Sequence, residues 1–323
     1  MKVFITGASG FLGSAVVRSL LRDNHEVIAI VRPTSQRKHL DQLGVEVITG
    51  ELTDTASLHR SMNGCEGLCH IAGAAGSFYL DEDNYYQANV VTTSHVFAAA
   101  KQAGIRRSVY CGSVVVPQRL DSPYGLSKRL GMQVAMASAD ENFVVTAVHP
   151  SGMIGPEDRK PTPLGQAVIQ LADGNMPITI GGGSGYIDVD DAADMHVAAM
   201  VRGDNLGEYI ANAEYFDNRV LYRELAKFTS QRAPFVLPIE IAQLYAAFDE
   251  PRARKEERSP VVSKFTTSYL AQGKAKDLDG KADRKRLNLP PAKPVLESFA
   301  DALEWFETNN MLGKEEDFGP SRA

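Results

Sequence analysis

The amino-acid sequence predicts an α/β fold built on a doubly wound parallel sheet, with a smaller domain interleaved in its carboxyl-terminal half. Through the first half of the chain, short apolar runs typical of buried strands alternate with amphipathic helical stretches. A glycine-rich turn separates the first strand from the first helix. The length of 323 residues exceeds the needs of one such sheet, which leaves chain for the second domain.

The glycine-rich turn lies inside a strand–turn–helix–strand unit that occupies residues 3–31. Gly7, Gly10 and Gly13 recur at intervals of three residues. Gly7 permits a tight turn, Gly10 lets a pyrophosphate approach the backbone, and Gly13 lets the helix pack closely on the strand. The N-terminus of a helix also attracts anions. Because the turn stands between a strand and a helix, it predicts a dinucleotide site rather than a turn without a ligand.

The residue after the second strand indicates which dinucleotide binds. Enzymes that use NAD usually carry Asp or Glu there for the ribose 2′-hydroxyl, whereas this chain has Arg32. A guanidinium favours a 2′-phosphate by its charge and its forked hydrogen bonds. We therefore predict NADP(H) in preference to NAD(H), with Ser35, Arg37 and Lys38 as further candidate contacts. The alternative is a solvated basic loop.

Two further α/β units follow. Residues 45–48 predict a third strand, and Thr53 or Asp54 is expected to cap the helix after it. Residues 67–73 predict the fourth strand and a glycine-alanine turn. His70 ends this strand within a mainly apolar segment, so we expect it to pack in the core rather than to catalyse.

A candidate catalytic group follows the fifth strand, which is predicted over residues 108–113 and ends in Ser113. Tyr124 and Lys128 are four positions apart and therefore share one face of a helix. A free tyrosine has a pKa of about 10, which is too high for efficient proton transfer at neutral pH. A nearby ammonium, together with the charge of an oxidised nicotinamide, lowers that pKa. Ser127, between the two, is expected at the helix surface.

The Thr6-Gly-x-x-Gly-x-x-Gly segment, followed by Ser113, Tyr124 and Lys128 in that order, resembles the short-chain dehydrogenase/reductase superfamily in its extended branch. The resemblance covers nearly the whole chain and is weakest over residues 233–295. It implies a homodimer and a catalytic triad of Ser113, Tyr124 and Lys128, with Ser113 holding the substrate oxygen. It also implies these cofactor contacts: Gly7, Ser9, Gly10, Phe11, Leu12, Arg32, Glu51, Leu52, Ala72, Tyr124, Lys128 and Pro150. Glu51 departs from the family's Asp, so only its location carries over.

Asn89-Val90-Val91-Thr92-Thr93 resembles the family's Asn-Val-x-Gly-Thr, with Thr92 in place of Gly. In relatives this Asn supports the helix and a proton-relay water near the active site. A polar residue that satisfies a helix terminus is an equal alternative.

The carboxyl-terminal half continues the resemblance through a sixth strand over residues 144–150 and a Val-x-Asp-Asp segment. Asp190 or Asp191 is expected to cap the next helix, and Asn218 a later one. The expected division assigns residues 1–155 and about 186–232 to the NADP-binding domain. Residues about 156–185 and 233–313 would form a substrate-binding cap, and residues 314–323 a flexible tail.

The composition is that of a soluble globular protein, with 44% hydrophobic and 23% charged residues. With 34 basic and 40 acidic residues the net charge is −6, which disfavours nucleic-acid binding. No apolar run approaches the roughly 18 residues that span a bilayer, and no signal peptide is evident. Cys65, Cys69 and Cys111 fit neither a disulfide framework nor a metal site. We expect reduced core thiols and a cytoplasmic protein.

Three activities are compatible with these motifs: a reductase of ketones or aldehydes, a nucleotide-sugar epimerase or dehydratase with tightly held NAD, and a cofactor sensor without catalysis. Nucleotide-sugar members usually carry an Asn after the sixth strand and an Arg before the Val-x-Asp-Asp segment. This chain has Ser151-Gly152 and Gly185-Tyr186 at those places. The intact triad disfavours the sensor.

The closest resemblance is to dihydroflavonol-reductase-like proteins, among them bacterial members described as hopanoid-associated sugar epimerases. We therefore predict an NADPH-dependent reductase of a small-molecule carbonyl substrate. The short segment 114–123 predicts an open mouth to the site. Phe78, Tyr79, Met153 and Tyr186 are candidates for its apolar lining, each equally compatible with plain core.

Overall fold

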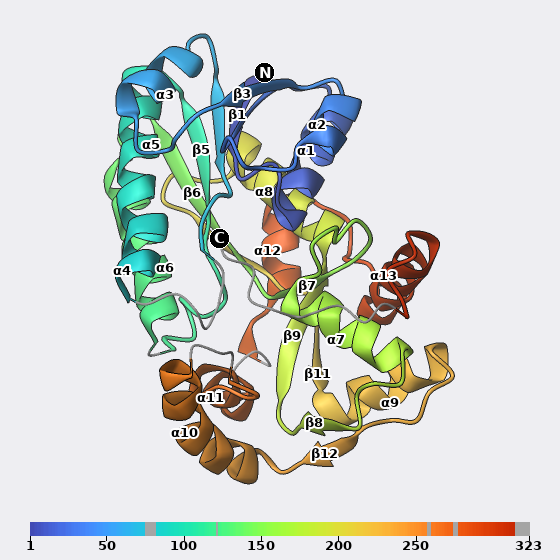
Figure 1. Cartoon of the computed structure of the whole chain (residues 1–323). Helices are drawn as coiled ribbons and strands as arrows, with labels where there is room; N and C mark the ends of the chain where they lie inside the picture. Colours follow the sequence, from blue (N-terminus) through green and yellow to red (C-terminus); the bar gives the residue numbers. More distant parts are fainter. Residues whose placement is uncertain (75–81, 121, 257–259, 274–276, 314–323) are drawn as a thin grey trace.

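A seven-stranded parallel sheet forms the upper part of the molecule in Figure 1, with strand order β10-β6-β5-β4-β1-β2-β3. Its strands are β1 (Lys2–Thr6), β2 (Glu26–Val31), β3 (Glu46–Thr49), β4 (Gly67–His70), β5 (Arg107–Cys111), β6 (Val144–Pro150) and β10 (Glu208–Ala211). The chain crosses from β3 to β4 on the other side of β1, so the strand order reverses beside β1. Ligands of open α/β sheets bind at this point, beyond the carboxyl ends of the strands. The predicted doubly wound sheet is confirmed.

The computed structural model describes the chain except for residues 75–81, 121, 257–259, 274–276 and 314–323. The expected flexible tail and the pocket candidates Phe78 and Tyr79 lie outside the described residues. Across the part of the chain that is described, no helix is long and apolar enough to cross a membrane.

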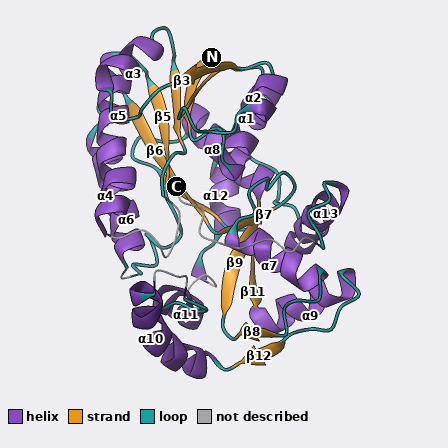
Figure 2. Ribbon diagram, in the orientation of Figure 1, coloured by secondary structure: helices purple, strands orange, loops and turns teal. Residues whose placement is uncertain are grey.

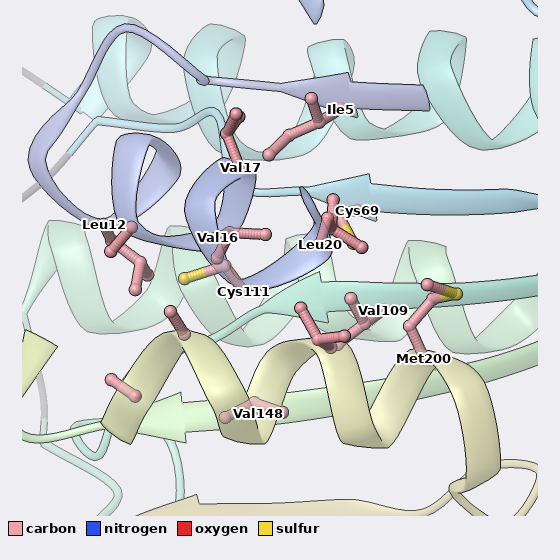
Figure 3. Packing of buried hydrophobic residues seen from close by; sticks show 14 of the residues in the cluster. Ile5, Leu12, Val16, Val17, Leu20, Cys69, Val109, Cys111, Val148 and Met200 are labelled. Carbon is pink, nitrogen blue, oxygen red and sulfur yellow. The ribbon is translucent and has the colours of Figure 1, made fainter. Parts of the chain in front are cut away.

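Helices cover both faces of the sheet (Figure 2). On one face lie α1 (Phe11–Arg22) and α8 (Val189–Arg202), and on the other α3 (Thr55–Ser61), α5 (Thr92–Gln102) and α6 (Pro123–Ala137). Within β1, Val3 and Ile5 pack toward the first pair, while Phe4 packs toward the second set. Figure 3 shows Ile5 among the residues of the first cluster. Because successive side chains of a strand point to opposite faces, two covered faces require the unbroken apolar runs that predicted these strands.

The lower part of the molecule contains two small sheets with helices around them. The three-stranded sheet β11-β9-β7 and the two-stranded sheet β12-β8 supply its strands. Its elements are β7 (Gly152–Ile154), α7 (Pro163–Ala172), β8 (Ile178–Ile180), β9 (Gly183–Asp188), β11 (Glu214–Asp217), α9 (Asn218–Phe228), β12 (Phe235–Leu237), α10 (Ile239–Lys255), α11 (Lys264–Gln272), α12 (Gly280–Arg286) and α13 (Val295–Thr308). α7, α9 and α13 share one apolar cluster, whereas α12 contacts β10. The division into two domains at the residues given above stays a prediction.

The helix caps agree with the sequence prediction once and differ from it twice. Asp54 caps α3, since its carboxylate accepts a hydrogen bond from the backbone N–H of Ser57. The expected caps at Asp190 or Asp191 and at Asn218 are wrong. Asp188 caps α8 and Asp217 caps α9, because these residues hold the extended backbone that an N-cap requires. Asp190, Asp191 and Asn218 already lie within these helices.

Candidate active site

The turn after β1 is packed so closely that only glycine fits at two of its positions. Gly7 has φ +75°, and a Cβ there would lie 2.6 Å from the backbone nitrogen of Ala72. A Cβ at Gly13 would lie 1.9 Å from the carbonyl oxygen of Gly7. The first turn of α1 is therefore held directly over the end of β1 by contacts that exclude any larger residue.

The N-terminus of α1 fits the phosphates of a dinucleotide. Gly10 is the N-cap residue, and no side chain caps the helix. A Cβ at Gly10 would meet only the carbonyl oxygen of Gly7, at 3.4 Å, so this side of the turn is open. The uncapped backbone N–H groups and the helix dipole can accept an anion there. Ser9 and Phe11 are half-buried beside it, whereas the Leu12 side chain lies in the core and leaves only its backbone for contact.

The expected contacts to the adenosine half lie at the carboxyl ends of β2 and β3. Arg32 directly follows β2, is exposed, and makes no side-chain hydrogen bond or ion pair with another described residue. Arg37, by contrast, lies 3.8 Å from the carboxylate of Asp41. Glu51 is exposed and Leu52 packs partly against the second core cluster. Arg32 is thus positioned to receive an anionic group.

The segment after β4 contacts both the glycine-rich turn and helix α6. The backbone N–H of Ala72 donates to the Thr6 hydroxyl at 3.2 Å. A Cβ at Gly73 would lie 2.6 Å from Oδ1 of Asn89 and 3.2 Å from Nζ of Lys128. Pro150 is buried at the end of β6, where its carbonyl accepts from the N–H of Val114. Cofactor and catalytic candidates therefore share one edge of the sheet.

The structure brings Ser113, Tyr124 and Lys128 together at this edge. Ser113 follows β5, and its hydroxyl hydrogen-bonds the Tyr124 phenol. Tyr124 lies in the first turn of α6, which begins at the Ser122 cap with Pro123 in its first turn. Lys128 is buried one turn later, and its ammonium donates a 2.9 Å hydrogen bond to the carbonyl of Cys111. Capping by the Ser122 side chain thus fixes where α6 begins and, with it, the position of Tyr124 along the helix.

Burial dominates the proton affinities of this group. It raises the pKa of Tyr124 well above the ordinary value for tyrosine, while the hydrogen bond from Ser113 acts in the opposite direction. Burial also lowers the pKa of Lys128. Lys128 is not among the groups that shift the pKa of Tyr124. Burial therefore favours the uncharged form of both side chains.

Aromatic side chains surround the Tyr124 ring. Tyr85, on α4 (Glu82–Tyr86), lies 5.7 Å away between ring centroids, and Phe265 of α11 lies 5.9 Å away, nearly perpendicular. Phe265 stacks on Tyr269, whose hydroxyl hydrogen-bonds Ser184 at 2.8 Å. Sequence reasoning missed Phe265 and Tyr269 because nothing in the pattern of residues 233–295 marks them.

Helix α11 also covers the segment that was expected to leave the mouth open. Phe265 and Tyr269 pack against the apolar cluster formed by Val115, Val116 and Leu120. Helix α11 thus covers this segment, and the expectation of a more open mouth stays a prediction. Of the other lining candidates, Tyr186 packs against Phe299 in the lower core, and Met153 packs partly against the first sheet cluster. Tyr186 is therefore a core residue, whereas Met153 is only half-buried.

A buried chain of hydrogen bonds connects the cofactor turn with the catalytic helix. Thr93 donates to the carbonyl of Asn89 at 2.7 Å, so its oxygen accepts from Nε2–H of His70 at 3.0 Å. Burial lowers the pKa of His70 to about 3, and the neutral ring then accepts at Nδ1 from the Thr6 hydroxyl at 2.8 Å. His70 is a core residue, as predicted, and both its nitrogens are paired.

Asn89 extends this chain to Tyr124. It lies in the π-helical turn η1 (Gln87–Val91), which is continuous with α4 and α5. Its side chain accepts from the N–H of Ala74 at 2.8 Å and donates to the Ser127 hydroxyl at 2.9 Å. Ser127 in turn donates to the carbonyl of Tyr124 at 2.8 Å. Asn89 therefore does not satisfy a helix terminus, and Ser127 is buried against it rather than exposed as expected. The relay water stays a prediction.

Cys65, Cys69 and Cys111 are free and buried, as predicted. Among the described residues, no three His, Cys, Asp or Glu side chains gather where they could hold a metal ion.

Comparisons with known proteins agree with this geometry. The model of the NAD dependent epimerase/dehydratase family matches residues 3–212. A Synechocystis sp. protein provisionally named dihydroflavonol 4-reductase is 32% identical, over 96% of this chain and 95% of its own. A 2-alkyl-3-oxoalkanoate reductase of Stenotrophomonas maltophilia is 29% identical, over 83% of this chain and 80% of its own.

Among solved structures, that of gox2253 superposes with a TM-score of 0.83 at 29% identity, covering 96% of this chain and 99% of that one. The glycine turn, the seven-stranded sheet and the family match over residues 3–212 lead to one conclusion. The chain belongs to the NAD dependent epimerase/dehydratase family and is an oxidoreductase of the extended short-chain dehydrogenase/reductase type.

Proposed function

We propose that the protein is an NADPH-dependent reductase of a ketone or aldehyde. The observation that carries the proposal is the geometry of the Tyr124 phenol, which hydrogen-bonds the hydroxyl of Ser113 and contacts the rings of Tyr85 and Phe265. Reduction of a carbonyl needs an acid that delivers a proton to the oxygen, and a tyrosine phenol next to a lysine ammonium can serve as that acid. The apolar walls suit an uncharged substrate.

Each residue of the triad has a separate task in this proposal. The nicotinamide, when bound, supplies a hydride to the carbonyl carbon. Tyr124 donates its phenolic proton to the carbonyl oxygen, and Ser113 donates a hydrogen bond that holds the same oxygen in place. Lys128, anchored on the Cys111 carbonyl, provides the positive charge that stabilises the phenolate left behind.

The preference for NADPH is proposed from Arg32. Strands β1 and β2 are neighbours in the sheet. The glycine-rich turn, with its open face at Gly10, follows β1, and the exposed guanidinium of Arg32 follows β2. A dinucleotide would extend from its pyrophosphate at the first place to its ribose at the second. A free cation at that end supports a 2′-phosphate contact.

A nucleotide-sugar epimerase or dehydratase is the alternative, because the matching family model carries that description. Two observations weigh against it. Gly152 stands where nucleotide-sugar members usually have Asn. At Gly185, where an Arg usually stands close by, a Cβ would lie 2.2 Å from Oδ1 of Asn212, so there is no room for a side chain. A cofactor sensor is less favoured, because the triad is complete.

The proposal is tested by mixing the protein with NADPH and a panel of aldehydes, ketones and dihydroflavonols while following cofactor absorbance at equilibrium and over time. Oxidation of NADPH with at least one carbonyl class is expected. No oxidation with any of them, together with turnover of a nucleotide sugar, would overturn the proposal in favour of the epimerase.

A further inference from the structure

Helix α10 buries its small residues and exposes its large apolar ones. Its buried apolar positions are the alanines Ala242, Ala246 and Ala253. Large apolar side chains are exposed at Ile241, Leu244, Tyr245 and Phe248, with exposed fractions of 52%, 75%, 46% and 75%. A surface helix of a soluble domain normally shows the reverse arrangement. The four exposed residues recur at i, i+3, i+4 and i+7, so they form one stripe along the helix, here called the outer stripe.

The segment after α10 continues the outer stripe. The backbone N–H of Val261 donates a 2.8 Å hydrogen bond to the carboxylate of Asp249, a buried residue of α10 that directly follows Phe248. This bond holds Val261, which is 72% exposed, near the end of the outer stripe. The outer stripe and Val261 are together called the apolar surface.

Exposed apolar side chains are concentrated in this part of the molecule. Among the described residues, the large apolar side chains that are exposed to 65% or more all lie within residues 235–261, and they are Phe235, Leu244, Phe248 and Val261. In Figure 1, α10 and the strand β12 that carries Phe235 lie at the lower edge of the molecule. Such a concentration marks an interaction site.

The apolar surface is distinct from the active site. Helix α11 packs on α10 and supplies Phe265, whose ring contacts Tyr124. The outer stripe lies on the exposed side of α10, whereas the wall of the active site is formed by α11. The apolar surface therefore needs an occupant other than the substrate or the cofactor.

Basic side chains border the apolar surface at the C-terminal end of α10. Lys255 follows Phe248 by seven positions, so it lies on the same side of the helix about two turns further on. Lys264 is held near this end, because its backbone N–H donates to the carboxylate of Glu250 at 2.9 Å. Within the described part of the chain, neither ammonium forms an ion pair or a hydrogen bond. The exposed acid Glu240 lies at the opposite end of the helix.

The local charge differs in sign from that of the whole chain. Residues 218–264, from the start of α9 to the start of α11, carry nine basic and six acidic side chains, whereas the whole chain has a net charge of −6. Apolar side chains bordered by cations complement an anionic lipid surface, because the apolar groups enter the acyl boundary while lysines extend to the phosphates. A lipid surface also accepts a convex helix, whereas a protein partner would need a matching hollow.

We propose that α10 docks the protein on an anionic lipid surface, with the apolar surface at the boundary between headgroups and acyl chains and with Lys255 and Lys264 on lipid phosphates. The helix lies in the plane of the lipid surface and does not cross it. Binding is reversible and weakens as salt is added, since salt screens the attraction between the lysines and the phosphates.

Flotation of the full chain with phosphatidylcholine vesicles, and with vesicles that also contain phosphatidylglycerol, tests the proposal without any turnover. The wild type is expected to bind the anionic vesicles more tightly than the neutral ones. Leu244→Glu and Phe248→Glu should each weaken this binding about tenfold or more, because a large apolar side chain no longer enters the lipid. Leu206→Glu, at a residue that is 54% exposed outside α10, is the matched control and should bind like the wild type.

Charge removal tests the lysines separately. Lys255→Gln should weaken binding to the anionic vesicles about fivefold and leave binding to the neutral vesicles unchanged. Lys281→Gln, at an exposed lysine of α12, is its control and should have no effect. Unchanged melting temperatures show that the variants fold.

Three results would overturn the proposal. The first is a wild type that binds neither kind of vesicle, and the second is binding that is insensitive to Leu244→Glu and Phe248→Glu. The third is equal binding to neutral and anionic vesicles. Association between protein molecules that is lost in Leu244→Glu, without vesicle binding by the wild type, would instead assign the apolar surface to a protein contact.

Discussion

Thr93 donates a 2.7 Å hydrogen bond to the backbone carbonyl of Asn89 from within the protein core. This bond determines which atoms donate and which accept in the chain of hydrogen bonds that runs from Thr93 through His70 to Thr6. It makes Nε2 of His70 the donor and Nδ1 the acceptor, which connects the end of β1 with the π-helical turn. Through Asn89 and Ser127, the same chain reaches the backbone of Tyr124. The backbone at Tyr124 is thus connected by hydrogen bonds to β1, β4 and the π-helical turn.

Replacing Thr93 by Val should therefore lower kcat by about tenfold, while the Kd for NADP changes little. Valine keeps the shape but leaves the His70 N–H without its acceptor and removes the hydroxyl that donates to the Asn89 carbonyl, which costs about 1–3 kcal/mol of stability. Steady-state kinetics, NADP titration and thermal unfolding measure the three quantities.

Thr146→Val is the matched control for this variant. Thr146 is equally buried, and its hydroxyl donates to the Ser108 carbonyl at 3.0 Å inside the sheet. It should lose similar stability with no effect on kcat. If both variants lower kcat alike, the connection from Thr93 to Tyr124 has no role in positioning.

Tyr124→Phe should reduce kcat by about a hundredfold or more, since general acid catalysis contributes about 10² to 10⁴. The ring contacts with Tyr85 and Phe265 persist in the variant, so the walls of the site should remain intact. Fluorescence titration with NADPH should give an affinity close to that of the wild type. A variant that still turns over at the wild-type rate would show that another group donates the proton.

Arg32→Asp should shift the ratio of kcat/KM for NADPH over NADH toward NADH by about 10–100-fold. That range corresponds to the loss of one or two charge-assisted hydrogen bonds to a phosphate. The same charge change at Arg37 should have a smaller effect, because Arg37 is already paired with Asp41. Equal selectivity in the wild type and Arg32→Asp would refute the assignment of Arg32.

Much of the sheet and of the site could be predicted from the sequence because the signals are local. The glycine-rich turn and the Tyr124–Lys128 pair each lie within a few consecutive residues, where the spacing in the sequence alone sets the geometry. The aromatic wall could not be predicted, because Phe265 meets Tyr124 only through the path of α11 over the fold. Ser127 was misplaced for a related reason: its burial depends on the π-helical turn at Asn89, which no spacing pattern indicates.

The prediction of the helix caps was wrong for a different reason. Asp188, Asp190 and Asp191 are all suitable N-cap residues by type, so composition could not choose among them. Asp188 alone has the extended backbone. Asp190 instead forms an ion pair with Arg18, and Asp191 forms one with Arg284. Tertiary contacts therefore decided which acid begins the helix.

The stability of the protein should fall as pH rises toward about 6, because of Asp158. Burial raises the pKa of this carboxyl from 3.8 to about 6, against the opposing hydrogen bonds from Thr162. A carboxyl with a raised folded-state pKa contributes stability that is fully present below its ordinary pKa and is lost as the pH passes its folded value. The total change is on the order of 2–3 kcal/mol.

Asp158→Asn keeps an oxygen that accepts from Thr162, the N-cap residue of α7, but carries no charge at any pH. Thermal unfolding at pH 5 and pH 8 should therefore show the wild type losing more stability than the variant between the two values. Parallel losses would mean that Asp158 is already ionised at pH 5, with its buried charge stabilised by Thr162.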